Sequence, residues 1–581
     1  MSFIHRSMYL VLIFACGIAA SLEAFELQQL QPLHSPRPGD MVEWELSAVD
    51  EAWLTAPSSA TPFMLISESD GSQWRRAAFR YQSFRTDPLH RNGEYQNRGP
   101  VTLRIRHSPR VSGSLRWQLF APGSDPSSAT PLASDSMQVL PGQGPAAAIA
   151  QAPFNKRLLA KANGDIFIPI GPNIAWSVGD DRLALFITYL DRLHAVGGNH
   201  IRVWCSSWFG QIEGTEPQNW RLDQAWLLDQ LFIACHQRGI YLTLVLDNHH
   251  DFQTGKNFPY GKEIGTRAQT FFTDPLADSY QERLNYLIAR YGHEDHLLAW
   301  ELFNEIDLTG IDRFRLVNWA RAAAAHLRSN DPYQRLRTIS WAGADWPEMR
   351  ALPDINFFQI HRYLPHLDQI QPGDRDLIAI MVGDTVPLID DDRPFIFAEV
   401  GHHGESGDLT PGNDIDKNGL ILAHKAWAGF LLGGAGPGMN WWWDTWIDTN
   451  DLWFIYRPLV DTISRINWQD RQLKPMEVPL NGDLRVIGWQ SPTQAIVWPQ
   501  SISDNWHQQL VAKVPNPLLG KRLTVTMNGM SLSRHFSVIV IDMFSGAVTH
   551  SAMARSNTIG QLAVALPPHN GNQIVVIQTI P

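Results

Sequence analysis

The feature that most constrains the fold of this 581-residue chain is an alternation of short apolar segments with amphipathic helical segments, beginning near Phe154. Repeats of this kind build a parallel sheet covered by helices. The predicted strands are Ile166–Asn173, Asn199–Trp204, Ile240–Asp247, Leu298–Asn304, Arg337–Trp341, Ile355–His361, Phe395–Glu399 and Gly438–Trp443. The clearest helices between them are Leu183–His194, Asp223–Arg238, Asp278–Tyr291, Asp312–Arg328 and Lys417–Leu432. Eight such units predict an α/β fold with one closed (β/α)8 TIM barrel.

The main alternative for this region is an open, doubly wound parallel sheet. Sheets of that type carry a glycine-rich phosphate loop after the first strand. The first predicted strand ends at Gly171-Pro172-Asn173, and no such loop follows it. The count of eight units therefore favours the barrel.

The region before the barrel has a different pattern. From about Phe25 to Leu140, apolar and polar residues alternate with a period of two, as in Val42–Leu46, Val101–Ile105 and Leu115–Leu119. Glycine and proline separate these runs, and no helical period is present. This pattern predicts a small antiparallel β-sandwich.

The last hundred residues return to strand-like runs and predict a second sandwich. Its predicted strands are Leu484–Trp489, Ala495–Trp498, Leu523–Thr526, Phe536–Asp542, Gln561–Leu566 and Ile574–Gln578. We therefore expect an N-terminal sandwich at 25–140, a linker at 141–153, a barrel at 154–470 and a C-terminal sandwich at 471–581.

The first 24 residues have the composition of a secretory signal peptide. His5 and Arg6 precede an apolar stretch, Met8–Ala20, and small residues follow it. This stretch is too short to span a membrane, and nothing like it recurs, so no transmembrane segment is expected. The bulky Phe14 makes the residues before Cys16 a poor lipoprotein motif. A secreted or periplasmic location is therefore favoured over lipid anchoring through Cys16.

Charge and cysteine content narrow the class of protein further. The net charge of -11 is spread along the chain, which disfavours nucleic acid and anionic membranes as partners. In a barrel, Cys205 would end the second strand and Cys235 would lie near the far end of the next helix. A disulfide needs Cα atoms within about 7 Å, so we expect two free, buried thiols.

In a (β/α)8 barrel the active site lies at the carboxyl ends of the strands, so polar residues there face one cavity. These residues are Arg202, Asp247–His250, Asn304, Glu305, His361–Tyr363, Glu399 and Trp441–Asp444. Glu305 and Glu399 follow apolar runs, where a carboxylate is costly. Two carboxyl groups at one rim can take different pKa values, one serving as an acid and one as a nucleophile. That pair is the equipment for cleaving a glycosidic bond.

The residue types at the rim suggest a role for each. Glu305 would protonate the leaving oxygen and then activate water, and Glu399 would attack the anomeric carbon. Arg202 and Tyr363 can hydrogen-bond Glu399 and hold it ionised. The remaining candidates would bind the sugar, through hydroxyl contacts or stacking: Asn304, His249, His361, Trp441 and Trp443. No cofactor or metal is required.

Five motifs resemble, in the same order, those of glycoside hydrolase family 5. They are Arg202-Val-Trp, Asp247-Asn-His249, Trp300-Glu-Leu-Phe-Asn304-Glu305, His361-Arg-Tyr363 and Phe397-Ala-Glu399-Val-Gly401. That family is the (β/α)8 cellulase and mannanase group of a large retaining clan. The resemblance implies Glu305 as acid/base, Glu399 as nucleophile and a β-linked polysaccharide or oligosaccharide as substrate. The N-terminal region also resembles the β-domain DUF5060 that precedes some bacterial barrels, and we expect a monomer.

Two other functions use some of the same residues. A metal-dependent barrel hydrolase could take His249, His250, Asp251, His361 and Glu399 as ligands. Enzymes of that kind usually present a His-x-His motif on strand one, and strand one ends here without a ligand. A carbohydrate-binding barrel without activity is the other alternative, although carboxylates on both catalytic strands speak against it.

Overall fold

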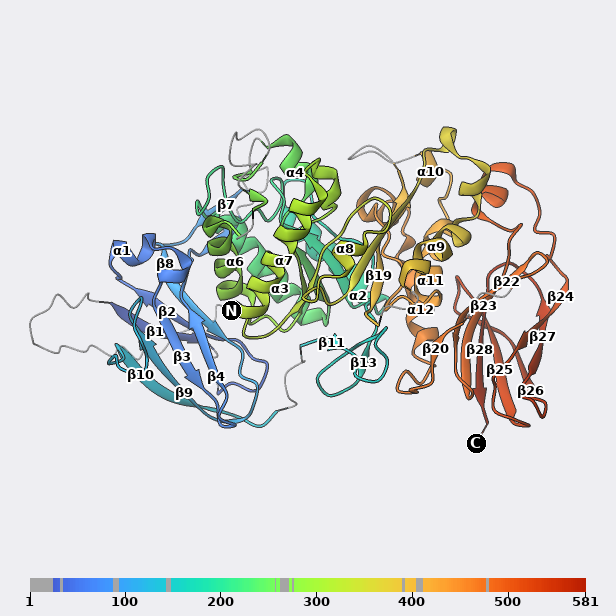
Figure 1. Cartoon of the computed structure of the whole chain (residues 1–581), viewed down its shortest axis with the longest axis horizontal. Coiled ribbons are helices and arrows are strands. Elements are labelled where there is room, and N and C mark those ends of the chain that lie inside the picture. Colours follow the sequence, from blue (N-terminus) through green and yellow to red (C-terminus); the bar gives the residue numbers. More distant parts are fainter. Residues whose placement is uncertain are drawn as a thin grey trace, which may run out of the picture.

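The computed structural model describes residues 25–31, 35–86, 94–142, 148–255, 258–261, 271–273, 276–388, 392–403, 411–476 and 480–580. The predicted signal peptide, with Cys16, lies outside these residues. Three regions lie side by side along the long axis: N-terminal strands in blue, a helix-and-strand region in green to yellow, and C-terminal strands in red (Figure 1). None of the described helices has the length and apolar character needed to cross a bilayer.

Six strands of the central region are regular and parallel. Four form a sheet in the order β14-β15-β16-β17, and β18 pairs with β19. Their bounds are β14 (His200–Trp204), β15 (Tyr241–Val245), β16 (Leu297–Glu301), β17 (Leu336–Thr338), β18 (Phe358–Leu364) and β19 (Phe395–His402). Nearly all of their residues are buried, as expected for parallel strands with both faces covered.

Backbone hydrogen bonds connect these two sheets, and the segments before and after them, into a ring. The linking bonds, donor first, are Asn199 N to Ile170 O (2.8 Å), Asn356 N to Arg337 O (2.8 Å), Val400 N to Met439 O (3.0 Å) and Asn173 N to Asn440 O (2.9 Å). The last of these joins the eighth segment to the first.

The first and eighth segments differ from the predicted strands. In the first, only β13 (Ile166–Phe167) is a strand, and it pairs antiparallel with β12 (Leu159–Ala160). Pro169 and Pro172 lack N–H donors, so the segment between them cannot form a regular ladder. The eighth segment has a single bridge, from Val400 to Asn440, because glycine and proline dominate the residues before it.

The predicted central helices are present, with ends within three residues of the expected ones. They are α2 (Arg182–Ala195), α3 (Leu222–Arg238), α6 (Asp278–Tyr291), α7 (Arg313–Asn330) and α11 (Leu420–Leu431). The helix α9 (Leu377–Thr385) was not predicted, because its apolar residues are nearly continuous and show no helical period. Cys205 and Cys235 are free and buried, as predicted.

The N-terminal region contains two four-stranded antiparallel sheets, β1-β2-β8-β5 and β10-β9-β3-β4. Their bounds are β1 (Glu26–Gln31), β2 (Val42–Ser47), β8 (Thr102–His107), β5 (Phe79–Tyr81), β10 (Ala133–Val139), β9 (Gly113–Phe120), β3 (Phe63–Ser67) and β4 (Gln73–Ala77). Both sheets contribute to one buried apolar cluster that includes Trp44 and Trp117. A short helix, α1 (Glu51–Thr55), departs from the all-strand prediction, and Asp50 caps it.

Buried ion pairs anchor the N-terminal sheets to the central helices. Arg106 of β8 binds Asp229 of α3 (2.8 Å), and Asp229 also binds Arg290 of α6 (2.5 Å). All three side chains are buried. The predicted linker is also partly structured, since β11 (Ala150–Gln151) pairs with β12.

The C-terminal region is built on a sheet in the order β20-β22-β23-β28-β25-β26, with β24 and β27 as a separate pair. The bounds are β20 (Lys474–Pro475), β22 (Leu484–Gln490), β23 (Gln494–Ser501), β24 (Arg522–Met527), β25 (His535–Asp542), β26 (Val548–Arg555), β27 (Leu562–Pro568) and β28 (Gln573–Thr579). One apolar cluster joins the pair to the sheet. The sequence did not predict β26, because most of its residues are exposed and few are large and apolar.

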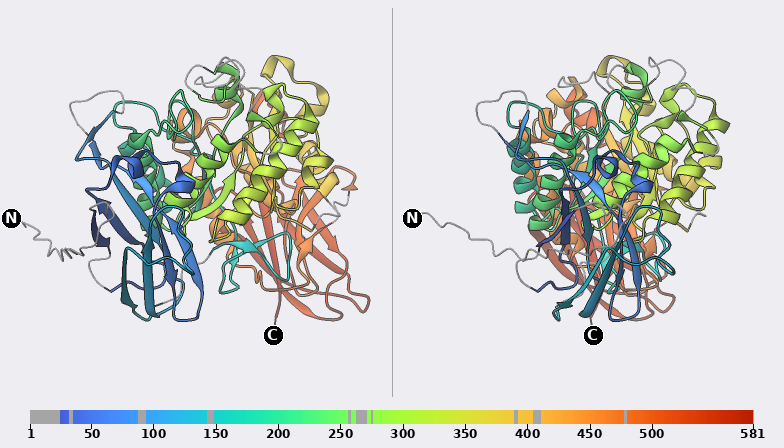
Figure 2. Two further views of the ribbon diagram at one scale, coloured as in Figure 1. Left: turned by 60° about the vertical axis from the view of Figure 1, so that its left-hand side comes forward. Right: turned by 90° about the vertical axis from the view of Figure 1, so that its left-hand side faces the viewer.

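The flanking sheets extend away from the ends of the central strands. The short helices α4 (His249–Thr254) and α10 (Pro411–Asp414), which follow the carboxyl ends of β15 and β19, lie at the upper edge of Figure 1. The flanking strands reach the lower edge in both Figure 1 and Figure 2. Most of the flanking strands therefore lie on the other side of the molecule from these two helices. The C-terminal region also reaches the carboxyl end of β19, where Trp506 packs against His402 (5.1 Å between ring centroids).

Candidate active site

The guanidinium group of Arg202, on β14, is the centre of a buried polar network. It donates to both oxygens of Glu301 (2.6 and 2.7 Å), to Asn304 Oδ1 (2.6 Å) and to Glu399 Oε1 (2.5 Å). Its side chain is 1% exposed, so the positive charge depends on these carboxylates, which raise the pKa of Arg202 although burial alone would lower it. The predicted contact between Arg202 and Glu399 is present, and Glu301 is a structural partner.

Glu399, on β19, is held by hydrogen bonds to both of its oxygens. Arg202 contacts Oε1, and the Tyr363 hydroxyl donates to Oε2 (2.7 Å). The β18–β19 register shifts by one residue between Ile360 and His361, which places His361 beside Glu399. A bulge of this kind redirects side chains next to it and is common at active sites.

Glu305 follows β16 and has a strained backbone. Its φ of +50° is in the left-handed region, which costs a residue other than glycine about 1–3 kcal/mol. The Ser340 hydroxyl supports this conformation, since it accepts from the Glu305 backbone N–H (3.0 Å) and donates to Glu301 (2.9 Å). The strain turns the Glu305 side chain toward Glu399.

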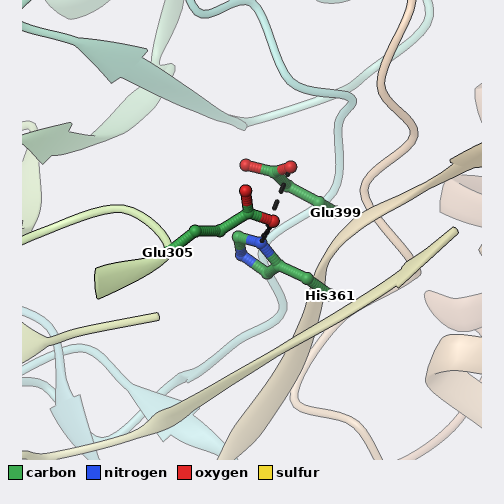
Figure 3. A group of neighbouring side chains, drawn as sticks. All are labelled: Glu305, His361 and Glu399. Atoms are coloured by element: carbon green, nitrogen blue, oxygen red, sulfur yellow. Dashed lines mark hydrogen bonds and ion pairs between the residues drawn. The ribbon is translucent and has the colours of Figure 1, made fainter. Parts of the chain in front are cut away.

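The two glutamates meet at one nitrogen of a single imidazole. His361 Nδ1 lies 2.9 Å from Glu305 Oε1 and 3.6 Å from Glu399 Oε2, as Figure 3 shows. One oxygen of each carboxyl group and one nitrogen of His361 all lie within 4.8 Å of one another. The nearest oxygens of the two carboxyl groups are therefore within 4.8 Å of each other, close enough for both groups to reach one glycosidic bond.

Burial raises the pKa of both Glu305 and Glu399 above the ordinary value. For Glu399, this burial outweighs the opposing effects of His361, Arg202 and Tyr363 on the pKa, so the ionised state of Glu399 stays a prediction. The partners still differ. Arg202 contacts Glu399 directly. Among the residues that the structure describes, the partners of the Glu305 carboxyl group are the imidazoles of His249 and His361, whose pKa values burial lowers. We therefore expect the first proton to leave Glu399.

Asn304 and His249 lie together beside Glu305. Asn304 Oδ1 accepts from Arg202, and its Nδ2 lies 3.3 Å from His249 Nδ1, which is itself 3.5 Å from Glu305 Oε2. The orientation of the Asn304 amide is therefore set by a cation behind it. His250 is exposed and contacts Trp208 instead (5.2 Å between ring centroids), so the two adjacent histidines point in different directions.

Tryptophans line one side of this network. Trp176 is the centre of the group, with ring centroids 5.0–5.5 Å from those of Trp204, Trp208, Trp441 and Trp443. Trp441 is partly exposed, whereas Trp443 is 1% exposed and offers no open face. The prediction that Trp443 floors a sugar site is therefore less well supported than the same prediction for Trp441. Trp220 stacks on Tyr286 (4.0 Å) and belongs to the loop packing.

Three residues that complete the site were not among the predicted ones. Ser340 and Asn173 are fully buried in the network around Arg202, and Trp176 holds the tryptophan group together. Ser340 and Asn173 lie at the ends of predicted strands five and one, so their position was the available signal. Ser, Asn and Trp are common at such positions, and only the fold singles these out.

The residues Glu305, His361 and Glu399 are the group that could hold a metal ion among the residues that the structure describes. The ligand set considered from the sequence is not assembled, because Asp251 accepts from the Ser207 N–H and the Asn248 side chain, and His250 points elsewhere. The Arg202 guanidinium, 2.5 Å from Glu399, opposes a second cation at this position.

No known family profile matches the chain. Mannan endo-1,4-beta-mannosidase F of Aspergillus fumigatus is 26% identical over 167 residues, which cover 26% of this chain and 38% of that protein. Mannan endo-1,4-beta-mannosidase A of Podospora anserina is 26% identical over 179 residues, 29% of this chain and 48% of that protein. The matched stretches thus span less than half of these curated relatives.

Solved structures resemble the chain over a longer stretch. A putative glycoside hydrolase from Bacteroides vulgatus ATCC 8482 has a TM-score of 0.62 at 14% identity and covers 94% of this chain and 100% of its own. A glycoside hydrolase family 5 protein from the same organism has a TM-score of 0.50 at 12% identity, over 74% of this chain and 92% of its own. The chain therefore shares the fold of these glycoside hydrolases.

Proposed function

We propose that the protein is a retaining β-glycosidase with a (β/α)8 catalytic barrel, in which Glu305 is the acid/base and Glu399 the nucleophile. The observation that carries this proposal is the convergence of two buried carboxyl groups, from the ends of β16 and β19, on one imidazole. The mannanase relatives and the shared fold support the same reaction class.

The geometry suggests how the residues would act. Glu399, ionised beside Arg202, attacks the anomeric carbon while Glu305 gives its proton to the departing oxygen. The glycosyl–Glu399 ester then reacts with water, which passes a proton to Glu305 and releases the sugar with retained configuration. The Asn304 amide, oriented by Arg202, is placed to donate to the sugar 2-hydroxyl.

The substrate we propose is a β-linked polysaccharide or oligosaccharide, with mannan-like backbones favoured by the curated relatives and cellulose-like ones as the alternative. The half-buried Trp441 would stack on a sugar ring next to the scissile bond. We further propose secretion through the N-terminal signal peptide, action as a monomer, and a bracing role for both sandwich-like regions, which contact the central region through Arg106–Asp229 and His402–Trp506.

Covalent labelling tests this proposal directly. Treatment with 2,4-dinitrophenyl 2-deoxy-2-fluoro-β-mannoside or -glucoside should add one glycosyl group, detected by intact mass and mapped by peptide sequencing to Glu399. The fluorine slows both steps, and the good leaving group lets the ester accumulate. A label on another residue, or oligosaccharide binding without turnover of any β-glycan, would overturn the assignment.

The pH dependence of kcat/KM should be bell-shaped, rising as Glu399 loses its proton and falling as Glu305 loses its own. Because burial raises both pKa values, both limbs should lie above the ordinary glutamate pKa of about 4.3. With an activated aryl glycoside, Glu305→Gln should remove the high-pH limb. Initial rates across the range test this, and a variant that keeps the limb would contradict the role of Glu305.

The metal group named above supports a second candidate, a metal-dependent hydrolase using Glu305, His361 and Glu399. Overnight dialysis against a chelator separates the two functions. A glycosidase of the proposed type should keep full activity. Loss of activity that zinc restores would favour the metal-dependent reaction instead.

A further inference from the structure

Lys425 is a buried lysine that the proposed mechanism does not use. It lies on α11 with no exposed surface, and its Nζ donates to the backbone carbonyl of Gly401 (2.5 Å). It makes no ion pair with the residues that the structure describes. Burial lowers the pKa of Lys425 to about 7, against the opposing charge of Asp416. An ammonium group without a paired anion is costly to bury, so its presence here needs a reason.

The carbonyl that Lys425 binds is on β19, two residues beyond Glu399. The register of β18 against β19 shifts just before this point, where Ile360 pairs with Phe397 but His361 pairs with Glu399. The end of β19 therefore does not simply continue the regular ladder. An additional hydrogen bond from α11 would hold this bulged end in place.

Gly401 also packs directly against the residue that binds the nucleophile. A Cβ atom at Gly401 would lie 3.0 Å from Cε1 of Tyr363 and 3.2 Å from Nε1 of Trp442. The hydroxyl of the same Tyr363 ring donates to Glu399 Oε2 (2.7 Å). A displacement of Gly401 would therefore move the ring that orients Glu399.

We propose that Lys425 is a positioning residue for the nucleophile: it holds the Gly401 carbonyl and thereby keeps Tyr363 and Glu399 in the geometry that attack requires. This inference rests on the proposed function of Glu399. A displacement of about 1 Å at a reacting group can cost about 100-fold in rate, so a hydrogen bond behind the strand can matter as much as one at the substrate.

The titratable groups near Lys425 are bound to other residues. Asp416 accepts the backbone N–H of Leu420 (2.8 Å) and of Ile421 (2.7 Å) at the start of α11. His402, which follows Gly401, packs on Trp506 of the C-terminal region at 5.1 Å. Among the described residues, Asp416 and His402 are the titratable groups whose charges interact with that of Lys425, and both are buried. The C-terminal region thus packs against the residue that follows Gly401.

The test replaces Lys425 by methionine, which keeps the volume and removes the donor. With a 2,4-dinitrophenyl β-mannoside or β-glucoside, kcat for Lys425→Met should fall about 10–100-fold while KM stays within twofold. The leaving group needs no proton, so the accompanying fall in kcat/KM, which measures the first step, reports on attack by Glu399 rather than on Glu305. The rate of labelling by the 2-fluoro glycoside should fall by the same factor.

Thermal stability distinguishes a positioning role of Lys425 from a role in stabilising the fold. The melting temperature of Lys425→Met should equal or exceed that of the wild type, because an unpaired buried charge is removed. Gly401→Ala, which crowds Tyr363 without altering the lysine, should reproduce the selective loss of kcat. Lys417→Met, at a largely exposed lysine, is the matched control and should change neither quantity.

Two results would overturn the inference: wild-type kcat and labelling rate in Lys425→Met, or a lowered melting temperature with kcat retained. If Lys425→Met does not fold, wild-type kcat in Gly401→Ala overturns it in the same way. Failure of the proposed function can be distinguished from failure of this inference about Lys425. If the proposed function is wrong, the wild-type enzyme will not be labelled at Glu399 at all.

Discussion

Replacing Glu399 by alanine should lower kcat by at least about 10⁴-fold with both natural and activated substrates. Loss of a nucleophile removes the covalent route itself, and comparable losses in other enzymes reach about 10⁶-fold. The vacated space beside Arg202 should admit a small anion. Added azide should therefore restore turnover of the dinitrophenyl glycoside and give a glycosyl azide of inverted configuration, identified by NMR.

Glu348→Ala is the matched control for this experiment, because Glu348 is a largely exposed glutamate whose ion-pair contact is a long 3.9 Å. It should leave kcat and KM unchanged. If Glu399→Ala kept more than about a hundredth of wild-type activity, Glu399 would not be the nucleophile.

Replacing Arg202 by methionine should have the second-largest effect, and it should reduce both stability and activity. The variant leaves Glu301 and Glu399 buried without their counter-charge, and breaking a buried pair costs about 3–5 kcal/mol. The free energy of unfolding, measured by urea denaturation at neutral pH, should fall by about that amount. The kcat value should fall as well, because Glu399 and Asn304 both lose the group that orients them.

A second substitution distinguishes the two effects. Glu301→Gln in the Arg202→Met background removes one of the two unpaired charges and should recover part of the unfolding free energy without recovering kcat. Arg313→Met is the control for an exposed arginine, where loss of a surface contact is worth about 0–1 kcal/mol. An Arg202→Met protein as stable as the wild type would show that the network does not depend on this cation.

Much of the local structure followed from the pattern of apolar residues. Strands such as β14 and β19 lie where short apolar runs predicted them, because parallel strands covered on both faces are apolar throughout. Helices such as α6 lie where the period of 3.6 residues predicted them, because that period reflects which side of a helix faces the core. The prediction was wrong where the local pattern carried no such signal. The apolar α9, the largely exposed β26 and the proline-containing first segment are examples.

The residues of the candidate site also divide into those that a local sequence pattern revealed and those that it did not. Glu305, Glu399, Arg202 and Tyr363 could be proposed from the sequence because a charged or phenolic residue at the end of an apolar strand is costly and therefore conspicuous. The burial of Trp443 and the part played by Ser340 could not, since serine and tryptophan are ordinary at such positions.

The sequence by itself thus determined which residues end the strands and which of them are costly enough to suggest chemistry, because both properties are local. Only the tertiary structure decided that His361 contacts both glutamates, that Arg202 binds two carboxylates, and that Lys425 is buried behind β19. These contacts join residues from 24 to 197 positions apart. Their geometry depends on how the strands register and how the helices pack, which no local pattern specifies.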